Sequence, residues 1–182
     1  AVQPEGNRNF RGLTDKIAAV CRELEVPVVA KEVGNGISVD AATRLHRAGV
    51  KAIDIAGKGG TSWSAVEAQR AARKGLRADL AFADWGIPTE EALVSVRQAL
   101  PAVQLIASGG IRSGVDIAKS IALGADLAAL GQPLLAAALE SSAKVVEFLA
   151  GVIHEVKVSM LCVGARDLAA LRRAPLTRSS RP

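Results

Sequence analysis

Three glycine-containing loops each follow a short run of apolar residues, and their composition suits the binding of an anion. Glycine lets the backbone approach a ligand closely, and successive backbone N–H groups in such loops form concave anion sites. Ser113 is a predicted helix N-cap with Asp116 three residues later, so the positive end of that helix would face the second loop. A phosphate is the ligand that this pattern predicts. The three loops are Gly57-Lys58-Gly59-Gly60-Thr61-Ser62, Ser108-Gly109-Gly110-Ile111-Arg112-Ser113 and Gly131-Gln132-Pro133.

A lysine is the second candidate functional group. Lys31 ends the continuous apolar run that begins at Val26, which is typical of a buried parallel strand. A lysine at a strand end can point into a binding site, and a solvated lysine at the rim of the sheet is the alternative. His46 and His154 lie within helical patterns without a paired nucleophile or ligand, so we interpret them as structural or surface residues.

Four predicted strands alternate with helices and would position these loops. Parallel strands place their carboxyl ends at one edge of a sheet, so the loops and Lys31 can meet there. This pattern is typical of an α/β fold, and specifically of the second half of a (β/α)₈ barrel, whose phosphate sites often follow strands seven and eight. Between Trp63 and Trp85 we expect a helix followed by a long excursion that serves as a lid or an interface, and its basic residues form either a solvated face or an anion site. The predicted strands cover 26–33, 51–57, 103–109 and 126–132, and the predicted helices cover 13–24, 41–48, 89–100, 114–123, 134–158 and 165–171. Ser38 is the predicted cap of the helix over 41–48, and Thr89 is the predicted cap of the helix that follows it.

The composition disfavours a nucleic-acid partner. Only 3% of the 182 residues are aromatic and tyrosine is absent, so the chain offers few side chains on which nucleic-acid bases could stack. The net charge of +5 owes much to four arginines near the end, in a segment predicted to be solvated. They are Arg172, Arg173, Arg178 and Arg181.

Cysteine usage and hydropathy predict a reduced, cytoplasmic setting. Cys21 and Cys162 lie far apart in apolar helical patterns, so we expect two buried thiols. The amino-terminal segment lacks the pattern of an export signal, and no apolar run is long enough for a membrane span. We expect one domain over 1–176 and a disordered tail over 177–182.

Five segments, in order along nearly the whole chain, resemble the type 2 isopentenyl diphosphate isomerases. These are FMN-dependent, Mg²⁺-requiring (β/α)₈ enzymes of isoprenoid synthesis. The segments are KEVGNGIS at 31–38, DIAGKGGTSW at 54–63, WGIPT at 85–89, ASGGIRSGVDIAKSIALGAD at 107–126 and VGARDLAAL at 163–171.

The resemblance implies a set of cofactor-binding residues. It places Lys31 beside the pyrimidine edge of the flavin and Thr61 on its phosphate side, and it places Ala56 where the family often has serine. The family's flavin is kept reduced by NADPH and moves protons during the allylic 1,3-shift that interconverts isopentenyl and dimethylallyl diphosphate. No catalytic residue is assigned. The residues implied to complete the phosphate pocket are Gly110, Ile111, Arg112, Gly131 and Gln132.

The resemblance also implies that part of the family's machinery lies outside this chain. A Gln-Glu pair that holds substrate and Mg²⁺ immediately precedes the segment corresponding to Ala1, so the metal ligand is expected upstream. Four strands instead of eight indicate the carboxyl-terminal half of a barrel. A lone half barrel exposes two sheet edges, which favours self-association, and the family commonly forms homo-oligomers. We therefore expect the isolated chain to bind FMN weakly and to be inactive alone.

Two other functions remain open at this point. One is an FMN-dependent (β/α)₈ oxidoreductase such as a 2-hydroxy acid oxidase, in which the SGGIR loop and the lysine at the strand end recur. Such an enzyme is expected to have a histidine after a late strand, whereas the region after Asp54 offers Lys58, Thr61 and Ser62. The other is a non-catalytic fragment that binds phosphate.

Overall fold

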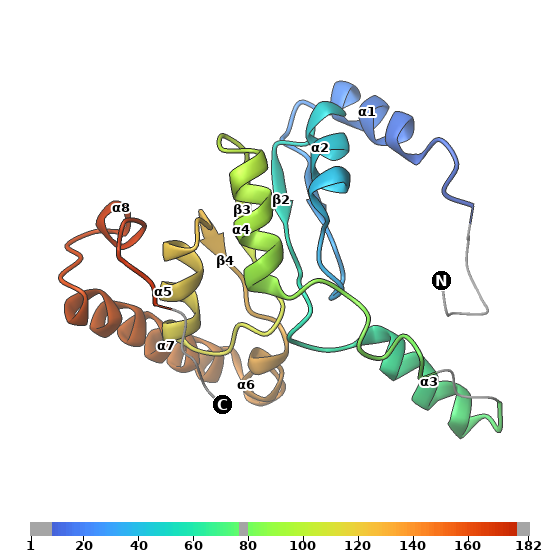
Figure 1. The fold of residues 1–182 in the computed structure, drawn as a ribbon. Helices are drawn as coiled ribbons and strands as arrows, with labels where there is room; N and C mark the ends of the chain where they lie inside the picture. The colour runs from blue at the N-terminus through green and yellow to red at the C-terminus, as the bar shows by residue number, and fades with distance from the viewer. Residues whose placement is uncertain (1–8, 77–79, 178–182) are drawn as a thin grey trace.

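Four parallel strands form the centre of the protein (Figure 1). The structure is a computed structural model that describes residues 9–76 and 80–177. The strands lie in the order β1-β2-β3-β4, each hydrogen-bonded to the next along the chain, and all pair in parallel. They are β1 (Val29–Lys31), β2 (Ala52–Asp54), β3 (Gln104–Ala107) and β4 (Leu127–Ala128), each shorter than the sequence pattern predicts.

Helices separate the strands and confirm the predicted α/β alternation. The helix α3 extends away from the sheet, and the long helix α7 lies beside α5 (Figure 1). The helices are α1 (Leu13–Glu23), α2 (Val39–Arg47), α3 (Trp63–Arg73), α4 (Thr89–Ala99), α5 (Gly114–Ala122), the 3₁₀ turn η1 (Gln132–Leu134), α6 (Leu135–Glu140), α7 (Ser142–Cys162) and α8 (Leu168–Leu171). No described helix is both long enough and apolar enough to cross a membrane.

Strand register divides the sheet into two unlike faces. Successive side chains of a strand point to opposite faces, and the paired residues Ile53 and Leu105 point to the helices and are fully buried. The opposite face lacks a second layer among the described residues. Val29 on β1 is 49% exposed there and Leu127 on β4 is 60% exposed. This arrangement is half of a (β/α)₈ barrel, with its inner face and both edge strands open.

Helix starts follow the predicted capping residues in two cases and differ in a third. The hydroxyl of Ser38 accepts from the backbone N–H of Ala41, and Ser113 and Asp116 form a reciprocal capping box at α5. Thr89, predicted to cap the helix that follows it, is instead the first residue of α4 after Pro88. The hydroxyl of Thr89 donates to the carbonyls of the loop after β3, so tertiary packing decides its role.

The predicted long helix over 134–158 is wrong as a single element. The backbone of Ser141 is extended, and its hydroxyl caps α7 by accepting from Lys144 N–H. The chain therefore turns between α6 and α7, and α7 continues to Cys162. The predicted helix over 165–171 shortens to α8, whose cap is Asp167.

The prediction of two buried thiols is also wrong. Cys162 is exposed at the end of α7, and Cys21 on α1 is only partly buried against the core. Apolar residues at a helical period show which face of a helix is apolar, but they do not show what packs against that face. In this protein α1 and α7 each pack along only part of their apolar surface, since neither has more than one fully buried residue.

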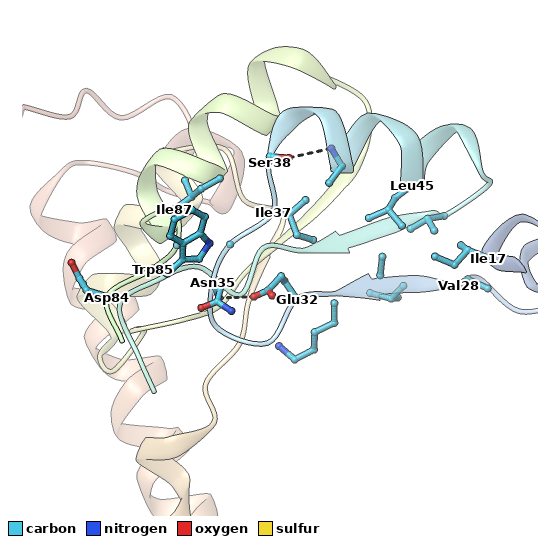
Figure 2. A pocket seen from close by; sticks show the side chains of 17 residues that line it. Ile17, Val28, Glu32, Asn35, Ile37, Ser38, Leu45, Asp84, Trp85 and Ile87 are labelled. Atoms are coloured by element: carbon cyan, nitrogen blue, oxygen red, sulfur yellow. Dashed lines mark hydrogen bonds between the residues drawn. The ribbon is translucent and has the colours of Figure 1, made fainter. Parts of the chain in front are cut away.

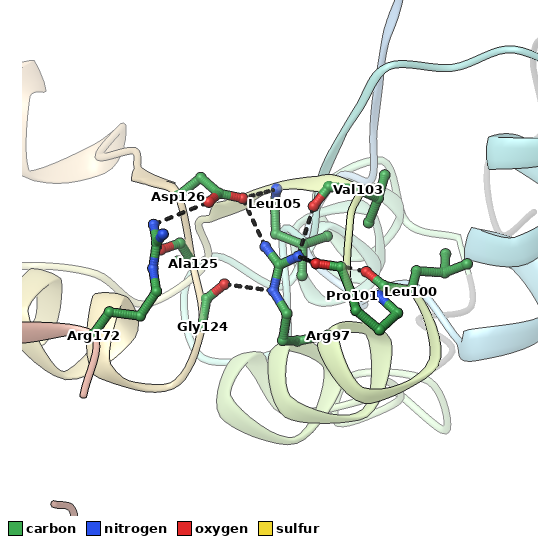
Figure 3. Close-up of polar contacts among 9 residues, drawn as sticks. All are labelled: Arg97, Leu100, Pro101, Val103, Leu105, Gly124, Ala125, Asp126 and Arg172. Atoms are coloured by element: carbon green, nitrogen blue, oxygen red, sulfur yellow. Dashed lines mark hydrogen bonds and ion pairs between the residues drawn. The ribbon is translucent and has the colours of Figure 1, made fainter. Parts of the chain in front are cut away.

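A charged network joins the amino ends of β3 and β4 (Figure 3). Arg97, near the end of α4, donates to the backbone carbonyls of Pro101, Val103 and Gly124, all at 2.8 Å, and pairs with Asp126 at 2.6 Å. Asp126 also accepts from Leu105 N–H at 2.9 Å. This network ties the start of each strand to the preceding helix.

Arg172 is an additional member of this network. Its guanidinium lies 3.0 Å from Asp126 and 3.2 Å from the carbonyl of Ala125 (Figure 3). The prediction that Arg172 belongs to a solvated tail is therefore wrong. Residues 178–182, which make up most of the predicted tail, lie outside the described residues.

Candidate functional site

A cleft of about 1270 Å³ opens at the carboxyl ends of the four strands. We call it the loop cleft. Its floor consists of residues that alternate along the strands and therefore point to the open inner face. Its volume exceeds the roughly 300–1,000 Å³ of a typical small-molecule site because one side is open. The floor residues are Lys31 at the end of β1 and Val33 beyond it, Asp54 at the end of β2 and Ala56 beyond it, Ser108 after β3 and Ala129 after β4.

Two glycine loops pack backbone against backbone at the rim of the loop cleft. A Cβ added to Gly109 would lie 2.1 Å from the carbonyl oxygen of Gly57, and one added to Gly110 would lie 2.7 Å from that of Gly59. Both Gly109 and Gly110 have positive φ angles, of 93° and 80°. The two loops can approach each other this closely only because both positions lack side chains.

The loop after β4 differs because its glycine faces open space. A Cβ added to Gly131 would meet no heavy atom within 4 Å. Within residues 9–76 and 80–177, the backbone N–H groups of four loop residues donate to no protein acceptor. An anion bound at the rim would satisfy these donors. The four residues are Gly110, Ile111, Gly131 and Gln132.

Arg112 adds positive charge at the same rim. Its guanidinium is exposed and lies 3.3 Å from the carbonyl of Gly59 and 3.2 Å from that of Gly110. The side chain thus bridges the two glycine loops. It also adds a cation to the donors that an anion would contact.

Asp116 holds the start of α5 beneath this rim. Burial alone would raise the pKa of Asp116 above its ordinary value of 3.8, yet the net shift is downward. The carboxylate accepts from the backbone N–H of Arg112 and from the hydroxyl and N–H of Ser113, and Lys119 lies nearby; together they hold the pKa low. The loop and the helix start are therefore joined by an ionised carboxylate at neutral pH.

Three polar side chains from three neighbouring strands meet on the floor. Lys31 Nζ lies 3.0 Å from Asp54 Oδ2 and 3.5 Å from Ser108 Oγ. The hydroxyl of Ser108 donates to Asp54 Oδ1 over 2.5 Å, and Ala56 N–H donates to the same oxygen over 3.2 Å. The side chain of Asp54 is 8% exposed and that of Lys31 is 58% exposed. A nearly buried carboxylate thus anchors an ammonium that faces the cleft, which decides against a freely solvated lysine at this position.

Ala56 takes a backbone conformation that is unusual for a residue with a side chain. Its φ angle is +37°, and it is the one described non-glycine residue with positive φ. The hydrogen bond from its N–H to Asp54 holds this conformation. Strain of this kind clusters at binding sites, where surrounding contacts impose it.

The structure brings all eight residues of the predicted cofactor site together. They all line the loop cleft, although they come from four separate loops. Their binding of FMN stays a prediction. The eight are Lys31, Ala56, Thr61, Gly110, Ile111, Arg112, Gly131 and Gln132.

Sequence reasoning missed two groups of residues in the cleft. Asp54 and Ser108 form the hydrogen-bonded floor. Strand alternation could have found them, because Asp54 ends β2 two residues before Ala56 and Ser108 directly follows β3. Phe82 and Trp85 form an edge-to-face pair with ring centroids 5.9 Å apart, and with Trp63 they line one wall. Phe82 and Trp85 lie on the excursion after α3, whose pattern carries no periodic signal, whereas Trp63 is the first residue of α3.

A second cleft of about 900 Å³, which we call the β1 groove, runs along the open edge of β1 (Figure 2). Ile17, Val28 and Leu45 make its apolar wall between β1 and the helices α1 and α2. Trp85 lines both clefts and stands between them. Glu32 accepts from the N–H of Gly34 and of Asn35, which fixes the loop at the end of the groove (Figure 2).

Neither histidine of the chain lines the loop cleft, and the described residues provide no group of metal ligands there. His46 on α2 and His154 on α7 are exposed, and neither lines the cleft, in agreement with their interpretation as surface residues. The described part of the chain holds no group of three or more histidine, cysteine, aspartate or glutamate residues placed to bind a metal ion.

A family model described as "FMN-dependent dehydrogenase" matches residues 8–178. The chain belongs to the FMN-dependent dehydrogenase family. Members of this family are enzymes that use the flavin named in its description, which agrees with a phosphate site in the loop cleft.

Curated relatives within this family carry the name isopentenyl-diphosphate delta-isomerase. One from Nostoc sp. is 51% identical over 174 residues, covering 95% of this chain and 50% of the relative. One from Stutzerimonas stutzeri is 53% identical over 181 residues, covering 99% of this chain and 52% of the relative. The chain therefore spans about half the length of the curated relatives it matches.

Two solved structures with the same fold are described as oxidases. A mandelate oxidase variant solved with an FMN adduct is 26% identical with a TM-score of 0.67, over 89% of this chain and 45% of that chain. A protein described as a lactate oxidase from Pediococcus acidilactici has a TM-score of 0.72 at 22% identity, over 96% of this chain and 42% of that one, which shows the fold alone. These coverages agree with half of a barrel.

Proposed function

We propose that this chain supplies the FMN-binding half of an isopentenyl-diphosphate delta-isomerase. The observation that carries the proposal is the convergence of three glycine-containing loops and one lysine on a single cleft, in a chain about 50% identical to proteins of that name. The reaction interconverts isopentenyl and dimethylallyl diphosphate, and bound reduced FMN would supply proton transfer.

The residues of the loop cleft fit a flavin nucleotide in two parts. The free N–H groups at Gly110, Ile111, Gly131 and Gln132, together with Arg112, would hold the phosphate. Lys31 would face the pyrimidine edge, where a cation stabilises negative charge on the reduced ring. In this proposal Thr61 lies on the phosphate side of the flavin, and Ala56 also lines the cofactor.

The rest of the reaction needs groups beyond this chain. We propose that NADPH reduces the flavin, and that Mg²⁺ and the substrate diphosphate bind mainly to the half of the protein that the relatives possess in addition. Assembly into a homo-oligomer stays a prediction, as do the domain limits at residues 1–176.

An FMN-dependent oxidation of a 2-hydroxy acid is the second candidate, and the structural likeness to mandelate oxidase favours it. That solved enzyme is 27% identical with a TM-score of 0.68, over 89% of this chain and 41% of the other. Against this candidate, a histidine base is expected for such a reaction, and both histidines of the chain lie outside the loop cleft.

The first experiment is a titration of the purified chain with FMN, followed by flavin fluorescence. We expect saturable binding that millimolar inorganic phosphate weakens, because the phosphate would occupy the same rim. Riboflavin, which lacks the phosphate, is the matched control ligand and should bind far less tightly. Equal affinities for FMN and riboflavin would contradict a phosphate site at the rim.

The reaction itself is tested by joining the chain to the remaining part of the Stutzerimonas stutzeri relative. The fusion is assayed with isopentenyl diphosphate, FMN, NADPH and Mg²⁺, and separately with mandelate and lactate. Isomerisation without oxidation supports the proposal. Oxidation of a 2-hydroxy acid supports the second candidate, and FMN binding without either reaction indicates a non-catalytic fragment.

A further inference from the structure

Asp54 is a charged group of the loop cleft to which neither the sequence nor the relatives gave a role. It ends β2, directly opposite Lys31 of β1 in the parallel register. Both side chains therefore point to the open inner face of the sheet, on the floor where the cofactor is proposed to lie. The two residues are unequal partners, since the carboxylate is nearly buried and the ammonium is more than half exposed.

The carboxylate of Asp54 is held rigidly while the lysine is not. Its Oδ1 accepts from the hydroxyl of Ser108 and from the N–H of Ala56, so contacts from the ends of β2 and β3 fix its position. Lys31 has a flexible four-carbon stem, and the partners of its ammonium are Asp54 and Ser108. Asp54 is therefore the group that determines where the ammonium stands.

The pair also has an electrostatic consequence for any ligand above it. An isolated lysine would present a full positive charge to the cleft, whereas a lysine 3.0 Å from a carboxylate presents a dipole. The attraction of a nearby anion for such a neutralised pair is much smaller than for a single cation. The strength with which Lys31 favours an anionic ligand thus depends on Asp54.

We propose that Asp54 is a positioning residue that acts through Lys31, holding the ammonium on the floor of the loop cleft and cancelling part of its charge toward the flavin. The proposal rests on the proposed function, because it assumes that FMN lies above Lys31. It predicts that Asp54 limits how strongly the site favours reduced FMN over oxidised FMN. A residue with a merely structural role would weaken the binding of both forms alike.

The test compares the dissociation constants of oxidised and reduced FMN for four proteins: the unchanged chain, Asp54→Asn, Lys31→Met and the double variant. We expect Asp54→Asn to raise the preference for reduced FMN about tenfold and Lys31→Met to lower it about tenfold, each about 30 mV for a two-electron couple. In the double variant neither side chain is charged, so its preference for reduced FMN should lie within about threefold of that of the unchanged chain. If Asp54→Asn lowers the preference for reduced FMN or leaves it unchanged, the inference is overturned.

Asp40→Asn is the matched control. It makes the same substitution in an exposed ion pair with Arg44 on α2, outside the loop cleft, and should leave the preference unchanged. If the separate chain binds FMN too weakly to measure, the same set is made in the fusion with the Stutzerimonas stutzeri relative. Absence of FMN binding in both formats overturns the proposed function and leaves the ion pair to be tested by itself.

Urea unfolding of the ligand-free chain supplies that separate test. Lys31→Met leaves a nearly buried carboxylate without its cation, so we expect the folding equilibrium constant to fall about tenfold. Asp54→Asn should cost less than this, because the lysine can turn to solvent. The double variant should recover most of the loss, and simple additivity of the two single changes would overturn the pairing on which the inference depends.

Discussion

The two ends of the same sheet are built in opposite ways. At the amino ends of β3 and β4, charged side chains satisfy backbone groups, since Arg97 alone binds three carbonyls at 2.8 Å and pairs with Asp126 (Figure 3). At the carboxyl ends, glycine loops pack directly on one another, and the backbone N–H groups of Gly110, Ile111, Gly131 and Gln132 donate to no acceptor within the part of the chain that the structure describes. The amino end therefore contributes stability, and the carboxyl end keeps its hydrogen-bonding capacity for a ligand.

This difference follows from how parallel strands meet their helices. Each helix of the sheet returns the chain to the amino end, where buried carbonyls need donors that an arginine can supply in several directions at once. At the carboxyl end the helix starts offer N–H groups, for which an anion is the natural partner. A change at one end should thus affect stability, and a change at the other should affect ligand binding.

Removal of the arginine at the amino end is expected to have the largest effect. Arg97→Met keeps the apolar stem but leaves three carbonyls without their donor and removes one of the two arginines that pair with Asp126, so unfolding should become easier by about 3 kcal/mol. Urea denaturation measures this loss, while the affinity of the folded protein for FMN should not change. Arg44→Met, which breaks an exposed pair on α2, is the control and should cost less than about 0.5 kcal/mol. If Arg97→Met lowers the free energy of unfolding by less than about 1 kcal/mol, the amino end of the sheet does not contribute the stability that this comparison assigns to it.

Substitution of Gly131 at the carboxyl end of the sheet is expected to lower the affinity for FMN and to leave stability almost unchanged. Gly131 has a negative φ angle and no atom near its added Cβ, so Gly131→Ala should leave stability almost unchanged. Its methyl group would enter the proposed phosphate site, and we expect FMN affinity to fall about tenfold, or about 1.4 kcal/mol. FMN titration and urea denaturation of the same sample separate the two effects.

A second glycine serves as the control for Gly131. Gly151 lies on the helix α7 and also has open space above it, so Gly151→Ala adds the same methyl group far from the loop cleft. It should stabilise the protein by up to about 1 kcal/mol through helix propensity and should not alter FMN affinity. Equal effects of the two substitutions on FMN binding would show that the rim does not contact the phosphate.

The smallest expected effect is the loss of stability on replacing Asp116, whose carboxylate holds the loop after β3 to the start of α5. The pKa of Asp116 is lowered in the folded protein, so its contribution to stability is complete above the ordinary value of 3.8 and is lost as the pH falls through the lower folded value. Asp116→Asn should cost about 0.5 kcal/mol at pH 7. The difference between the two proteins in urea denaturation should shrink as the pH falls below 3.8, the ordinary pKa of the carboxyl group. A difference that stays constant as the pH falls further would contradict the ionised carboxylate as its cause.

The sequence alone determined the alternation of four strands with helices, the caps at Ser38 and Ser113, and the three loops at one end of the sheet. These features depend on residues near one another along the chain, where hydrophobic period and capping act locally. The family resemblance implied the eight proposed cofactor residues, and the structure placed all of them in one cleft.

Only the tertiary structure decided which side chains meet across the strands. Asp54 lies 23 residues from Lys31 and 54 residues from Ser108, and strand register alone brings them together. The same holds for Arg172 and Asp126, which local patterns assigned to a tail and to a strand. Exposure of Cys162 and the break at Ser141 likewise depended on what packs against each helix. Local patterns set the elements, because their energies are local, whereas the chemistry of the site arises from contacts that exist only once the sheet has formed.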